Sequence, residues 1–148
     1  MHLFKIVQDN LFNTRQLWKF RVRSTQSPLV LGMCVCYKLL ESSFKQDLTD
    51  NAQGLFAISS IGEVYNHKSE TVSRLPFKLQ EGDLVAMLQN SKTSVLTFSK
   101  LGSGRSTWET LVELDIYSRP QLICLPCIGL GAEGDSVEIV FEPTVNLE

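Results

Sequence analysis

The sequence predicts an all-β chain that folds as an antiparallel β-sandwich of two packed sheets. Apolar residues alternate with polar ones, strand-like segments recur at intervals of roughly 8–15 residues, and turn-forming residues separate these segments. The alternation is clearest from Trp18 to Arg23, where Trp, Phe and Val occupy one face and three cations occupy the other. This pattern is typical of a strand with one face on a core and one in water.

The remaining strands follow from the same pattern. Leu29–Cys36 is apolar on both faces, which predicts a fully buried central strand, and Leu3–Val7 is predicted to be an edge strand. The segment 107–116 fits a strand or a helix equally well. Further strands are predicted at Leu55–Ile58, Glu63–Asn66, Leu84–Leu88, Ser94–Phe98, Leu122–Leu125 and Val137–Phe141, with hairpin turns at Ser59–Gly62 and Gln89–Lys92. The predicted core contains Trp18, Phe20, Leu31, Ile58, Val85, Phe98 and Ile139.

The length of 148 residues predicts one domain with one hydrophobic core, spanning 1–148 and monomeric. No apolar run is long enough to cross a bilayer, and the first residues lack a secretory signal. The four cysteines lie in apolar, strand-like settings, which predicts reduced thiols and a cytoplasmic location. Leu147-Glu148 resembles a cloning scar, which suggests a domain excised from a larger protein.

Charge is distributed unevenly along the chain. Residues 1–45 carry seven Lys and Arg against two Asp and Glu, whereas residues 109–148 carry one Arg against eight acids. We expect the two end segments to lie side by side, with Arg21 or Arg23 near Glu138 or Glu142. The alternative interpretation is a basic face that binds a partner.

Taken in order, these segments resemble the SPRY family from about Trp18 to Phe141. The most similar stretch is Phe77–Ala86, which contains a Gly82-Asp83 turn followed by an apolar strand. The sequence departs from the family after Phe98, where a longer, Gly-rich turn replaces the usual Lys-Asn-Gly. Further matches are Leu17–Val22, Val30–Cys34, Gly54–Ile58, Gly62–Tyr65, Leu96–Phe98, Gln121–Pro126 and Gly134–Phe141.

The resemblance implies a noncatalytic recognition module within a larger protein, such as a scaffold or a ubiquitin-ligase substrate receptor. Family members grip protein segments with loops at one end or face of the sandwich. Here the loops expected to supply the site are Tyr37–Gln53, Asn66–Leu75 and Lys100–Trp108, because loops on a rigid framework can vary without disturbing the core.

Catalysis, metal binding and nucleic-acid binding are each disfavoured. The two histidines, His2 and His67, lie in no recognisable activating motif, and no cofactor motif is present. The pairs Cys34-x-Cys36 and Cys124-x-x-Cys127 lack the tight knuckle of a zinc site, so packing of thiols in the core is favoured. The cationic stripe on 19–23 has no interleaved exposed aromatic residues in the sequence, which favours a solvated strand face.

The candidate partner-binding residues are loop aromatics and arginines, because Trp, Tyr and Arg dominate the energetics of interfaces. Trp108 is the main candidate, although it fits a core position equally well. The alternative function is a carbohydrate-binding sandwich, in which Trp108 stacks on a sugar ring and Asn66 or Asp50 binds its hydroxyls. The full partner-binding set is Trp108, Arg105, Tyr65, Arg74, Tyr117 and Arg119.

Overall fold

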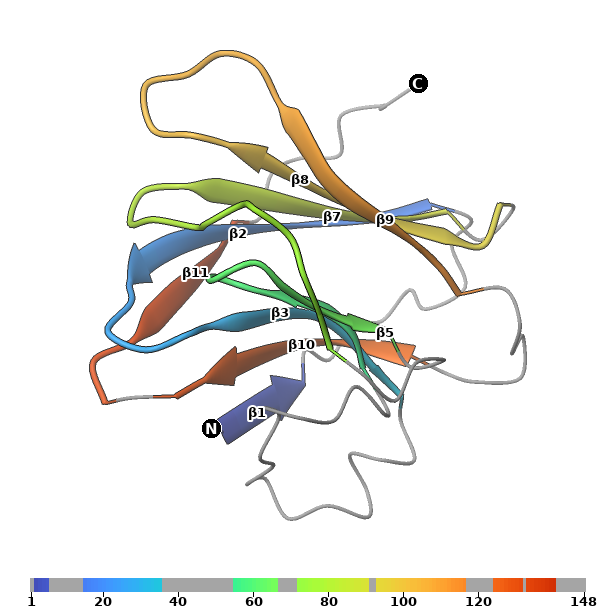
Figure 1. Ribbon diagram of the computed structural model, residues 1–148, viewed down its shortest axis with the longest axis horizontal. Coiled ribbons are helices and arrows are strands. Elements are labelled where there is room, and N and C mark those ends of the chain that lie inside the picture. Colours follow the sequence, from blue (N-terminus) through green and yellow to red (C-terminus); the bar gives the residue numbers. More distant parts are fainter. Residues whose placement is uncertain are drawn as a thin grey trace.

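The computed structural model describes residues 2–5, 15–35, 55–66, 72–90, 93–116, 124–131 and 133–140, and these form two antiparallel sheets packed face to face (Figure 1). The first sheet has the strand order β1-β10-β3-β4-β5-β6, and the second has the order β11-β2-β7-β8-β9. The all-β sandwich prediction is therefore confirmed. The strands are β1 His2–Lys5, β2 Arg15–Ser24, β3 Val30–Val35, β4 Leu55–Ser59, β5 Glu63–Asn66, β6 Ser73–Arg74, β7 Leu84–Asn90, β8 Val95–Leu101, β9 Glu109–Asp115, β10 Cys124–Leu130 and β11 Ser136–Val140.

One segment left open by the sequence has a definite outcome, and one predicted strand is longer than expected. The segment that fitted helix or strand is the strand β9, which pairs with β8 and has a register irregularity between Phe98 and Ser99. The strand predicted to end at Leu125 continues through Pro126 to Leu130. Within the described residues β1 pairs with Cys127–Leu130, and Pro126 lies just beyond this ladder, a position where proline is tolerated. None of the described residues forms a helix long and apolar enough to span a membrane.

Strands from the two ends of the described chain pair with each other, β1 with β10 and β11 with β2. β1 lies at the edge of the six-stranded sheet as predicted, and β11 pairs with β2 so that Arg21 lies opposite Glu138. The Arg23 Nε atom donates a hydrogen bond of 2.8 Å to Glu138 Oε2. The expected pairing of basic and acidic segments is thus confirmed, although Glu142 lies outside the described residues. Exposed ion pairs of this kind stabilise a fold by only about 0–1 kcal/mol.

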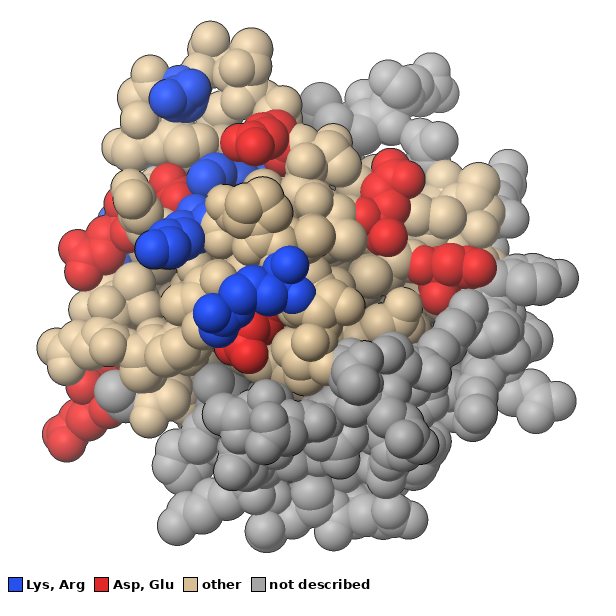
Figure 2. All heavy atoms as spheres, in the orientation of Figure 1, with Lys and Arg blue, Asp and Glu red and all other residues tan. Residues whose placement is uncertain are grey.

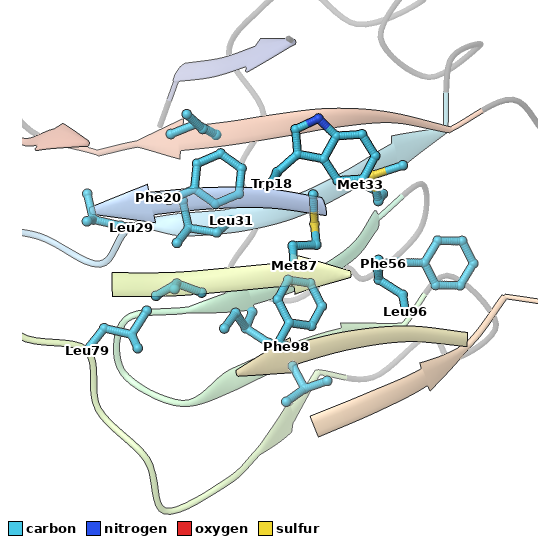
Figure 3. Close-up of a cluster of buried hydrophobic side chains, with 14 of the residues drawn as sticks. Trp18, Phe20, Leu29, Leu31, Met33, Phe56, Leu79, Met87, Leu96 and Phe98 are labelled. Carbon is cyan, nitrogen blue, oxygen red and sulfur yellow. The ribbon is translucent and has the colours of Figure 1, made fainter. Parts of the chain in front are cut away.

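The main core lies between the two sheets (Figure 3). Alternation on β2 points Trp18 and Phe20 inward, where they meet Met87 of β7 and Phe98 of β8. Of the seven predicted core residues, six are at most 5% exposed. Ile139 is only partly buried, because β11 is an edge strand whose outer side is open among the described residues. The fully buried large side chains include Phe20, Phe98, Leu29, Leu31, Met33, Leu55, Ile58, Met87 and Leu96.

A second buried apolar cluster lies on the opposite face of the six-stranded sheet. Its members alternate along β3, β4, β5 and β10 with residues of the main core, and the described part of β3 is consequently buried on both faces. The prediction of a fully buried central strand is therefore confirmed for Leu29–Cys34. The cluster consists of Val30, Cys34, Leu55, Ala57, Tyr65 and Cys127.

We predict that Gly32→Ala destabilises the fold. Gly32 lies opposite Ala57 on β4, and an added Cβ would lie 2.3 Å from the Phe56 carbonyl oxygen and 2.4 Å from the Ala57 Cβ. Backbone atoms cannot move aside cheaply, so we expect a loss of about 1–3 kcal/mol or more in the free energy of unfolding, measured by urea denaturation. Gly102→Ala is the matched control, because its nearest contact would be an ordinary 3.5 Å to the Arg105 side chain. Equal stability of the two variants would contradict the close approach of β3 and β4.

Candidate partner-binding surface

Five connections lie at one end of the sandwich, which we name the turn end (Figure 1). They join β2 to β3, β4 to β5, β6 to β7, β8 to β9 and β10 to β11. Of the three loops predicted to bind a partner, only the one from Lys100 to Trp108 is fully described, and it lies at this end. The loop 37–53 falls outside the described residues, as do positions 67–71 of the second loop.

The turn before β7 is fastened to β2. Asp83 Oδ2 accepts a 2.8 Å hydrogen bond from the Gln80 backbone N–H, and Gly82 has a φ of 89°, a conformation that glycine adopts without strain. The Gly82 N–H donates to the Val22 carbonyl at 2.7 Å, and the Val22 N–H donates to the Asp83 carbonyl at 2.9 Å. Arg21 Nη1 adds a 3.3 Å bond to the Gly82 carbonyl oxygen. The predicted Gly-Asp turn therefore holds a fixed position against a central strand.

The loop between β8 and β9 lies beside this turn. A Cβ built on Gly82 would lie 3.4 Å from the Ser103 Cβ, an ordinary van der Waals contact, so the Ser103 side chain lies next to this turn. Within the loop, the Arg105 N–H donates to the Gly102 carbonyl at 3.0 Å, and Gly104 has a φ of 76°. Arg105 is exposed, with its aliphatic stem against Gly102. The loop thus presents an arginine and several hydroxyls from a compact turn.

Trp108 follows this loop directly and is 43% exposed, the large hydrophobic side chain that stands out on the described surface. The Lys19 Nζ atom lies 5.9 Å from the centre of its ring. Cation–π contacts at exposed sites contribute roughly 0.5–1 kcal/mol, enough to favour one ring position. The core alternative for Trp108 is wrong, because Thr110 and Trp108 continue the outward-facing alternation of β9.

These contacts define one continuous surface on the outer side of the five-stranded sheet and its turns, which we name the Trp108 surface. We expected no exposed aromatic residue beside the cationic stripe, and this expectation is wrong, because the exposed Trp108 ring lies next to Lys19. Trp108 and Lys19 come from strands at opposite parts of the sheet order, so only the sheet topology brings them together. The surface consists of Lys19, Arg21, Gly82, Ser103, Arg105 and Trp108.

The other predicted site residues lie elsewhere. Tyr65 lies on β5, not in a loop, and is only 2% exposed in the second buried cluster, so it cannot offer its ring to a partner. Arg74 is exposed on β6, opposite Glu63, in the six-stranded sheet. Tyr117, Arg119 and the carbohydrate candidate Asp50 fall outside the described residues, and Asn66 is half-buried at the end of β5. Of the four described members of the predicted set, Trp108 and Arg105 are the two that lie exposed in the loop between β8 and β9.

The described cysteines behave as core residues. Cys34 and Cys127 are at most 1% exposed and pack in the second cluster, on the neighbouring strands β3 and β10. A side-chain hydrogen bond with Cys127 lowers the pKa of the Cys34 thiol, although burial acts in the opposite direction. Within the described ranges, no group of His, Cys, Asp and Glu is arranged to hold a metal ion. Cys36 is outside those ranges.

No family model matches the chain, and no curated protein does. Solved structures do. The SPRY domain of human HERC1 superposes with a TM-score of 0.59 at 13% identity, covering 94% of this chain and 77% of that domain. The TRIM65 PSpry domain gives 0.62 at 14% identity, covering 86% of this chain and 65% of that domain.

The chain has the SPRY fold. The resemblance seen in the sequence is therefore confirmed for the arrangement of strands over most of the chain. Winged bean acidic lectin, complexed with methyl-α-D-galactose, also aligns at 13% identity over 90% of this chain and 69% of that one, but its TM-score of 0.48 carries no argument. At this level of identity a SPRY fold does not name a partner, so function has to be argued from the surface.

We predict that Cys34 and Cys127 react with a thiol reagent only when the domain unfolds. Both side chains are buried in an apolar cluster, and a reagent reaches them only after the sheet opens. Pulse alkylation followed by peptide mass spectrometry should show both thiols unmodified under native conditions and fully modified in denaturant. Cys34→Ala is a useful companion, because Cys127 should remain protected in it. Rapid native labelling of either thiol would mean that this face of the sheet is accessible.

Proposed function

We propose that this SPRY-fold domain is a noncatalytic module that binds a protein or peptide segment through the Trp108 surface. The observation that carries the proposal is an exposed tryptophan held against Lys19, beside a loop that presents Arg105. Tryptophan and arginine are the residues most enriched among binding hot spots. The surface is built on a strand and a fastened turn, so little ordering is needed when a partner binds.

The proposal extends to the context of the domain. We place it in the cytoplasm as a single unit spanning 1–148, monomeric, within a scaffold or a substrate receptor. Buried thiols kept as free cysteines support a reducing compartment. The same burial supports a noncatalytic role, since Cys34 and Cys127 are withdrawn from any surface a substrate could reach.

A peptide partner is favoured over a carbohydrate by the groups around the ring. Sugar-binding sites surround an aromatic platform with amides and carboxylates that bind hydroxyls. Here the ring contact of Trp108 is with Lys19, and the loop before it carries Arg105, and these cations suit the backbone carbonyls and acidic side chains of a peptide.

We predict that Trp108→Ala weakens binding of a partner obtained by affinity enrichment by roughly 2 kcal/mol or more, the usual size of a hot-spot loss. Its melting temperature should stay close to that of the parent domain, because the ring is exposed and outside the core. Isothermal titration calorimetry and a thermal melt on the same samples measure both quantities.

Arg74→Ala serves as the surface control, because Arg74 is exposed on the other sheet and should leave affinity unchanged. Parent-like affinity in Trp108→Ala, with a lowered melting temperature, would instead assign Trp108 a structural role. The partner site would then lie outside the Trp108 surface.

A further inference from the structure

The guanidinium groups of the Trp108 surface differ in how their charge is compensated. Arg23, at the neighbouring position on the same strand face, is paired with Glu138. Arg21 faces the same acid in register, yet its guanidinium contacts the Gly82 carbonyl oxygen instead. Arg105 has no acidic partner among the described residues. Among the described residues, neither Arg21 nor Arg105 therefore has a carboxylate partner.

These groups retain most of their hydrogen-bonding capacity. A guanidinium has five N–H donors in a planar fork, and Arg21 uses one of them on a backbone carbonyl. The half-buried setting of Arg21 makes an added charge-assisted bond stronger than one in open water. A carboxylate is the side-chain acceptor whose shape matches this fork.

The local charge balance points the same way. Cations near the two turns outnumber acids, and one of those acids, Asp83, is buried and bonded to the Gln80 backbone. On the face shown in Figure 2, the Lys and Arg side chains lie toward the turn end, interspersed with Asp and Glu, whereas the charged side chains described toward the opposite end are Asp and Glu. The cations of this region are Lys19, Arg21, Arg23, Lys78, Lys100 and Arg105, and the acids are Glu81, Asp83, Glu109 and Glu138.

We propose that the segment bound by the Trp108 surface is an acidic peptide segment of a partner protein, whose carboxylates pair with Arg105 and Arg21 while an apolar side chain packs on Trp108. This inference rests on the proposed function and narrows it to one partner chemistry. An extended polyanion such as a nucleic acid is less suited, because Glu81 and Glu109 lie in the same region and interrupt the positive surface.

The test uses the whole chain and a random-peptide display library as the probe. Peptides are selected on the parent domain, and those that bind the Trp108→Ala variant more weakly are kept. Each kept peptide is synthesised in two versions, one as selected and one in which every Asp and Glu is replaced by Asn and Gln. We expect the selected sequences to be rich in Asp and Glu, and the neutral version to bind about tenfold more weakly or worse. Affinity should also fall as the salt concentration rises.

Matched variants locate the effect. Arg105→Glu should weaken the acidic peptide about tenfold or more, whereas Arg105→Lys should retain more of the affinity because it keeps the charge. Arg74→Glu introduces the same charge change on the other sheet and should leave the affinity nearly unaltered. For Arg21→Ala, the melting temperature is measured alongside the peptide affinity, because Arg21 also fastens the turn at Gly82.

The outcomes separate the two proposals. Selected peptides that require Trp108 but are not acidic, and that bind Arg105→Glu as well as the parent, would overturn the acidic-partner inference and leave the peptide-binding proposal standing. A library from which no Trp108-dependent peptide emerges would count against the proposed function itself. If an oligonucleotide binds through Arg105 more tightly than any selected peptide, the partner class proposed here is wrong.

Discussion

The register of β2 is the constraint on which the rest of the structure depends. Its alternation points Trp18, Phe20 and Val22 into the core and Lys19, Arg21 and Arg23 to the outer face. A shift of one residue against β7 would place three cations in the core and three apolar side chains in water. The register that packs the core correctly therefore also exposes the three cations on the outer face.

The same strand also fixes the positions of chain segments that are distant in sequence. It pairs with β11 on one side and β7 on the other. Its Val22 accepts a backbone hydrogen bond from Gly82 and donates one to Asp83 in the turn. The loop carrying Ser103 lies against that turn, and Trp108 reaches back to Lys19. Each part of the Trp108 surface therefore lies on β2 or is connected to it by these contacts. This explains how loop residues can hold a defined arrangement.

Strands were predictable from the sequence because alternation and turn chemistry are local. The segments around β2, β4, β5, β7, β8 and β11 were recognised within a few residues, and the predicted Gly82-Asp83 turn is present. What could not be predicted depends on strand order. The burial of Tyr65, the partial exposure of Ile139 and the passage of β10 through Pro126 all follow from which strand lies next to which. The contact of Lys19 with Trp108 has the same origin.

The uneven charge of the sequence had two competing explanations, and the structure shows that they apply to different residues of one strand. Pairing of the chain ends accounts for Arg23, whose partner Glu138 is supplied by β11. Arg21 stands opposite that acid but bonds to the turn, and therefore keeps its charge on the surface. Among the described residues, Glu138 pairs with Arg23 and not with Arg21, so this acid neutralises only one of the two arginines. Pairing of the chain ends and a locally positive surface are consequently compatible. The register of the strands decides which arginine an acid can reach, whatever the total charge of the two segments.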